Sequence, residues 1–203
     1  MKRSFQLPYI LPEEEDVIKR LNYNPKKTLL TEDIYSIIKK EIETSKGFIS
    51  PRGITYEFII KSNQDNKVFL EDIEIVSKKL SDVLKNSNKI TIIAATIGEE
   101  ITKEVEKRLK EENYTAAVIL DAIGSEAIES FVDYIQNILE REKKLSGYKP
   151  TMRYSPGYGD LSLDFNAYIL DKLSTKEIGL TIHPETKILK PEKSITAIIG
   201  WER

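Results

Sequence analysis

The chain has 203 residues, of which 40% are hydrophobic and 32% are charged. A chain of this length can bury about two thirds of the surface that its unfolded form exposes, so we expect one domain over residues 1–203. Its 31 basic residues nearly cancel its 33 acidic residues, and the net charge of −2 offers no field of one sign to a nucleic acid or an anionic membrane. We therefore expect neither as a partner.

The absence of cysteine excludes disulfides, thiolate metal sites and a cysteine nucleophile, and with a single histidine we expect no metal site. The basic start of the chain is not followed by an apolar segment of the kind found in signal peptides. The longest apolar stretch, residues 90–97, is too short to span a bilayer. These features predict a soluble, cytoplasmic protein.

The first part of the chain is predicted to alternate irregular and regular segments. Residues 1–12 are expected to form an irregular arm fixed by two prolines, and the acidic run after them predicts a short helix over residues 13–21. A second helix is expected to begin at Thr31. From residue 53 to residue 60 the apolar period changes to two, which predicts a strand buried mainly on one side. A strand at residues 68–70 is expected to pair with it as a hairpin.

The remaining segments continue this mixture of periods. The expected helices are residues 75–84, 99–111, 115–142 and 162–173, and the expected strands are residues 89–98 and 194–201. Strand pairs joined by turns favour an α+β fold with a twisted, largely antiparallel sheet and several flanking helices.

The most unusual local sequence is Arg-Tyr-Ser-Pro-Gly-Tyr-Gly-Asp at residues 153–160. A proline and two glycines favour a tight backbone there, and an arginine and two tyrosines are displayed within a few residues. Such a loop can close on a small ligand. On these residues alone, a connecting loop whose arginine forms a surface ion pair is an equally good interpretation.

Residues 153–158, Arg-Tyr-Ser-Pro-Gly-Tyr, resemble the Arg-x-x-x-Gly-Tyr signature of the activation domain of cobalamin-dependent methionine synthase, including a proline before the glycine. Residues 128–134, Ile-Glu-Ser-Phe-Val-Asp-Tyr, resemble the Ala-Glu-Ala-Phe-Ala-Glu-Tyr helix of that family. Residues 191–196 resemble the segment that leads into its last strand, and residues 21–25 more faintly resemble its Ile-Asp-Trp-Thr-Pro. The resemblance also implies the α+β fold of that domain.

The resemblance implies a stand-alone activation module that binds S-adenosylmethionine. The module would present the methyl group for reductive remethylation of cob(II)alamin on a partner, a cobalamin-binding methionine synthase subunit, with a flavodoxin-like electron donor. The chain would then be a subunit of a methyltransferase system in methionine biosynthesis. By position, the resemblance assigns ligand contacts to Glu129, Arg153, Tyr154, Pro156, Gly157 and Tyr158.

The chemistry of the ligand agrees with this assignment. A guanidinium such as Arg153 can hold a carboxylate with two hydrogen bonds, and a carboxylate such as Glu129 favours a nearby ammonium or sulfonium. An aromatic ring such as Tyr158 suits adenine. Because cobalt is the methyl acceptor, the site needs only to orient its ligand, and we expect no catalytic acid, base or nucleophile.

The sequence departs from the family at three places. After Tyr158 the family has Pro-Ala-Cys-Pro, whereas this chain has Gly159 and Asp160. The family has an acidic residue near the start of the domain, where this chain has Asn22. The sequence ends at Arg203, before the region in which the family supplies a further aromatic contact to the ligand. These departures favour a second hypothesis, a non-catalytic scaffold or regulatory subunit of a cobalamin methyltransferase that no longer binds S-adenosylmethionine.

A third hypothesis concerns the strand-to-helix corner at Gly98. An unrelated small-molecule enzyme using this corner would have a pocket with His183 or acidic side chains beside the turn. A purely structural corner and a loop histidine are the plainer interpretations, since a single glycine lacks a phosphate-binding fingerprint.

Overall fold

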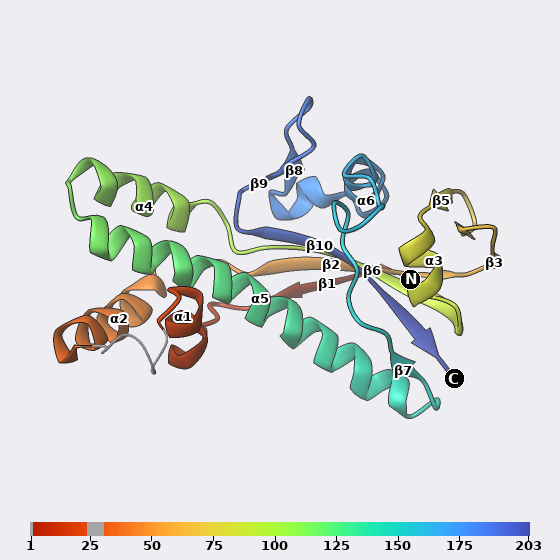
Figure 1. The fold of residues 1–203 in the computed structure, drawn as a ribbon, viewed down its shortest axis with the longest axis horizontal. Helices are drawn as coiled ribbons and strands as arrows, with labels where there is room; N and C mark the ends of the chain where they lie inside the picture. The colour runs from red at the N-terminus through yellow and green to blue at the C-terminus, as the bar shows by residue number, and fades with distance from the viewer. Residues whose placement is uncertain (1, 24–30) are drawn as a thin grey trace.

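The computed structural model describes residues 2–23 and 31–203, and its centre is an antiparallel five-stranded sheet (Figure 1). The strand order is β1-β2-β6-β10-β7, and every neighbouring pair is antiparallel. The strands are β1 (Lys2–Gln6), β2 (Arg52–Ile59), β6 (Ser87–Thr96), β10 (Ser194–Glu202) and β7 (Lys149–Pro150). The predicted α+β fold with an antiparallel sheet is confirmed.

Helices cover both faces of this sheet. The central strand β6 is a β-branched run whose residues from Ile90 to Thr96 are all buried, as a strand covered on two sides requires. Figure 1 shows the long helix α5 on one side of the sheet and α6 on the other. The first face carries α1 (Glu14–Arg20), α2 (Glu32–Ser45), α4 (Glu100–Lys110) and α5 (Tyr114–Lys144), and the second carries α3 (Lys78–Val83), α6 (Phe165–Leu173) and the 3-10 turn η1 (Thr175–Ile178).

The packing of α5 on β2 depends on Gly53. A Cβ atom at this position would lie 2.7 Å from Cδ1 of Ile135 and 3.3 Å from Cε1 of Phe131, so glycine admits the helix to the sheet. Thr55, on the same face, is buried as well. The prediction that this strand is buried mainly on one side therefore fails in its first half, where Gly53 and Thr55 lie under α5. It holds in the second half, where Phe58 is buried and Ile59, on the opposite face, is 55% exposed.

The first strand was also missed. Residues 2 to 6 of the predicted irregular arm form β1, which pairs with β2 from Lys2 opposite Tyr56 to Gln6 opposite Arg52. The pairing adds an edge strand through backbone hydrogen bonds to a segment some fifty positions away, and no local pattern in the arm reports it. Asn24 and Pro25, which belong to the faint family match over residues 21–25, lie outside the described residues.

The segment after β2 forms a separate three-stranded sheet of β3 (Ser62–Gln64), β4 (Lys67–Phe69) and β5 (Glu74–Val76). The hairpin predicted between residues 53–60 and 68–70 was wrong, because β4 pairs with β3 and β5. The helix predicted from residue 75 begins only at Lys78. Ser77 marks the boundary, since its hydroxyl accepts a hydrogen bond of 3.0 Å from the backbone N–H of Leu80.

The other predicted elements agree with the structure. Thr31 caps α2 by accepting from the N–H of Ile34, and Trp201 in β10 is fully buried, with its indole N–H donating to Oγ1 of Thr91 over 2.8 Å. A two-stranded hairpin, β8 (Thr181–Ile182) and β9 (Leu189–Lys190), precedes β10. Within residues 2–23 and 31–203, no helix combines the length and the apolar character needed to cross a bilayer.

Candidate functional site

An open pocket of about 490 Å³ lies where the residue 152–158 loop meets α5 and the start of β10. Its lining includes five of the six side chains predicted to contact a ligand, namely Glu129, Arg153, Tyr154, Pro156 and Tyr158. It also includes residues from the segment that leads into β10, which resembles the corresponding segment of the family: Glu192, Ser194, Ile195 and Thr196. Three stretches that are far apart in the sequence therefore meet at one surface.

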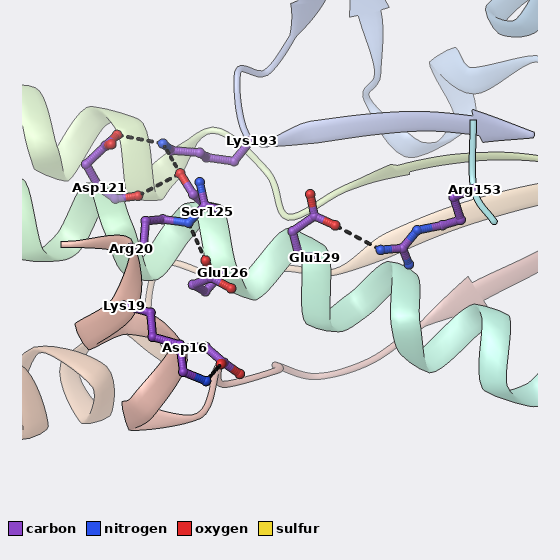
Figure 2. Close-up of polar contacts among 9 residues, drawn as sticks. All are labelled: Asp16, Lys19, Arg20, Asp121, Ser125, Glu126, Glu129, Arg153 and Lys193. Carbon is purple, nitrogen blue, oxygen red and sulfur yellow. Dashed lines mark hydrogen bonds and ion pairs between the residues drawn. The ribbon is translucent and has the colours of Figure 1, made fainter. Parts of the chain in front are cut away.

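Arg153 is the central charge of this pocket. Its Nη2 donates to Oε2 of Glu129 over 3.1 Å, and its Nη1 donates to Oδ1 of Asp133. Figure 2 shows the side chains of Glu129 and Arg153 pointing toward one another from α5 and the loop. The Arg153 side chain is 25% exposed, so a ligand arriving through the open pocket can reach the guanidinium. The structure thus brings together the two predicted polar residues.

Two further polar contacts lie on the same helix nearer its start. Lys193 Nζ donates to Oδ1 of Asp121 over 2.6 Å and to Oγ of Ser125 over 2.9 Å. Figure 2 shows Lys193 reaching from the segment before β10 toward Asp121 and Ser125 on α5. Positions 121, 125, 129 and 133 are four residues apart and share one face of the helix. Lys193 binds one end of this polar face and Arg153 binds the other. These contacts hold the segment before β10 and the residue 152–158 loop against α5.

The loop that carries Arg153 is anchored to the sheet by Tyr154. The backbone N–H of Tyr154 donates to the carbonyl of Ile198 over 2.9 Å, and the N–H of Ile198 donates back to the carbonyl of Tyr154 over 2.8 Å. The buried phenol donates to the carbonyl of Tyr158 over 3.1 Å, and burial raises the pKa of Tyr154. Tyr154 therefore braces the loop as a neutral donor, whereas the Tyr158 ring, 69% exposed, remains open to solvent.

Gly157 does not line the pocket but makes its turn. Its φ of +91° lies in the left-handed region, and its N–H donates to the carbonyl of Leu161 over 2.8 Å. A Cβ atom there would lie 2.9 Å from Cδ2 of Leu163. The positive φ and the close approach of Leu163 explain why residue 157 is a glycine, and neither requires a contact between this glycine and a ligand.

Asp160 explains one departure from the family pattern. Its carboxylate accepts from the hydroxyl of Ser77 over 2.6 Å and from the N–H groups of Lys78 and Lys79 over 2.7 and 3.3 Å. The hydrogen bond from Ser77 is the main cause that holds the pKa of Asp160 below its usual range, with the two backbone N–H groups adding to it. Asp160 thus fastens the end of the loop to the start of α3 and does not line the pocket.

Three residues in or beside the pocket were not predicted as site residues from the sequence. Asn166 and Thr196 are nearly fully buried in the lining, and the Thr196 hydroxyl donates to Oδ1 of Asn166 over 2.6 Å. Asp133, which pairs with Arg153, was also missed, although its position four residues after Glu129 on a helix was a usable signal. The Asn166 contact crosses 30 positions and left no local pattern.

A second pocket, of about 660 Å³, lies at the Gly98 corner, as the third hypothesis expected. Three acidic side chains of the described residues line it, together with an equal number of basic ones: Glu99, Glu106 and Glu192, and Arg52, Lys103 and Lys190. His183 is not among the described residues that line it. The Nδ1 atom of His183 instead accepts from the N–H groups of Glu185 and Thr186, in the turn between β8 and β9.

The fold and the pocket at Arg153 define a small α+β module with an arginine–glutamate pair at an open surface site. No family model and no curated protein matches the sequence. Among solved structures, the chain is similar to the reactivation domain of MetH bound to AdoHcy, with a TM-score of 0.72 and 12% identity over 98% of this chain and 78% of that chain. The chain has the fold of that reactivation domain, which confirms the fold that the resemblance implied.

Proposed function

We propose that this chain is a reactivation module for a cobalamin-dependent methionine synthase that binds S-adenosylmethionine. One observation carries the proposal. The Arg153–Glu129 pair lines an open pocket in a fold shared with a domain that is bound to AdoHcy, the molecule left when S-adenosylmethionine has lost its methyl group. The site offers a cation and an anion side by side, which suits the carboxylate and ammonium of an amino-acid ligand.

In this proposal each residue of the pocket contacts a different part of the ligand or supports the loop. Arg153 holds the ligand carboxylate, Glu129 faces the ammonium and the sulfonium, and the exposed ring of Tyr158 packs against the adenine. Tyr154, Pro156 and Gly157 hold the loop in shape. When bound, S-adenosylmethionine would supply a methyl group activated by its sulfonium charge, and the chain only binds and orients it.

Exposed apolar side chains around the pocket support a partner that covers it. Met152 and Tyr158 are each 69% exposed, Ile188 is 56% exposed and Leu163 is 42% exposed, and all four line the same pocket. Apolar side chains gathered at one opening are typical of a surface that another protein covers. We propose that this partner is the cobalamin-carrying subunit in the cytoplasm. Methyl transfer from a sulfonium to cob(II)alamin requires one electron, which a flavodoxin-like donor would supply.

Calorimetric titration with S-adenosylmethionine tests the ligand assignment. We expect wild type to bind and Arg153→Ala to lose at least about tenfold in affinity, because a charged hydrogen-bonding partner is removed. The matched control is Arg3→Ala, which removes another arginine that pairs with an acid of α5, Glu142, outside this pocket. No binding to wild type at millimolar ligand would overturn the proposal.

A scaffold subunit without ligand is the second candidate. It is favoured by the pairing of Arg153 with two carboxylates, Glu129 and Asp133, which already compensates its positive charge without a ligand. This candidate expects wild type to associate with the cobalamin-binding subunit and not to bind S-adenosylmethionine. Co-sedimentation of the two proteins, with and without the ligand, separates the candidates.

A further inference from the structure

We infer that Asp133 competes with the ligand carboxylate for Arg153 and so sets the affinity of the site, an inference that rests on the proposed function. Arg153 is held by two acids that lie one helical turn apart on α5. Glu129 lines the pocket, whereas Asp133 does not. The ion pair with Glu129 therefore holds the guanidinium beside the pocket, whereas the ion pair with Asp133 holds it beside a residue outside the pocket.

The two acids have opposite consequences for a ligand that carries both a carboxylate and an ammonium. Glu129 can keep its place beside Arg153 and also face the ammonium, so its charge is compensated in the complex. Asp133 has no such second partner in the pocket. A ligand carboxylate that takes the Nη1 donor of Arg153 must displace Asp133. One that binds through the other N–H groups of the guanidinium still shares its positive charge with Asp133.

Exposure sets the size of this effect. The Asp133 side chain is 60% exposed, so water can solvate it once Arg153 leaves, and an exposed ion pair is weak. Loss of such a pair corresponds to a change of about two- to fivefold in an equilibrium constant. Asp133 therefore weakens binding moderately in the free protein and does not block the site.

Calorimetric titration of the full chain with AdoHcy, and with 5′-methylthioadenosine as a ligand lacking the carboxylate and ammonium, tests the inference. Asp133→Asn should bind AdoHcy about two- to fivefold more tightly than wild type and should bind methylthioadenosine equally well. Glu129→Gln should bind AdoHcy more weakly. Glu142→Gln is the matched control, because it removes a similarly exposed negative charge of α5 that pairs with Arg3 and leaves Arg153 untouched.

The outcomes separate this inference from the proposed function. Equal or weaker AdoHcy binding by Asp133→Asn, with wild type still binding, overturns the role of Asp133 alone. A gain that also appears with methylthioadenosine or with Glu142→Gln overturns it too, because the effect would then be one of general charge. No AdoHcy binding by wild type overturns both. Thermal melting checks the fold of each variant, and Asp133→Ser repeats the test if Asp133→Asn fails to fold.

Discussion

The buried hydrogen bond beneath the pocket offers a direct test of how the site is supported. The hydroxyl of Thr196 on β10 donates to Oδ1 of Asn166 on α6 over 2.6 Å, and the two residues are 4% and 3% exposed. Thr196→Val keeps the shape of the side chain and removes the donor. The Asn166 oxygen would then be nearly fully buried without that partner.

An unsatisfied buried polar group costs about 1–3 kcal/mol, and the near-complete burial of both residues places Thr196→Val at about 2–3 kcal/mol. For a chain of this length the loss corresponds to a fall of about 5–10 °C in the melting temperature. Thermal melting and urea denaturation measure it. Thr181→Val, at an exposed threonine on β8, is the matched control and should stay within about 0.5 kcal/mol of wild type.

The double variant decides whether the pair itself is responsible. Asn166→Leu alone should destabilise the protein more than Thr196→Val, because the Asn166 amide also donates to the carbonyl of Lys187 over 3.3 Å. The combination should cost less than the sum of the single changes by about 0.5–3 kcal/mol, since both polar partners are then absent. Strict additivity, or a Thr196→Val variant as stable as wild type, would refute the reasoning.

Three further outcomes follow from the loop and the core. Gly159→Ala should destabilise the protein more than Gly147→Ala, because both glycines have positive φ but only a Cβ at Gly159 would meet Oη of Tyr154 at 2.4 Å; equal losses in urea denaturation would contradict this. Asp160→Asn should destabilise the protein at pH 7. Because the pKa of Asp160 is held below its ordinary value of about 3.9, its contribution is fully present above that value and is lost as the pH falls through the lowered pKa, so the difference from wild type should shrink at pH 3. Trp201→Phe should cost about 1–3 kcal/mol, because the Thr91 hydroxyl loses its buried indole donor; an unchanged melting temperature would argue against that role.

The sequence predicted an element correctly where the apolar pattern within that element matches the face that it buries. The 31-residue helix α5 carries an apolar stripe from Ala116 to Leu139, and β6 contains the β-branched run from Ile90 to Ile93, so both were recognised close to their ends. The Arg153 loop was found because arginine, proline, glycine and tyrosine occur together at a recognisable spacing. The position of Glu129 depended on the resemblance, and the structure places it 3.1 Å from Arg153.

Periodicity and motif spacing predicted most of the helices, the two central strands and the Arg153 loop, because both are properties of neighbouring positions in the chain. Three features became visible only in the tertiary structure: residues 2 to 6 form β1, Gly53 leaves room for α5, and Asp133 shares Arg153 with Glu129. It also turned Asp160 toward α3 and away from the pocket. These contacts join segments far apart in the chain, and their energies depend on sheet register and packing, which no local window of sequence contains.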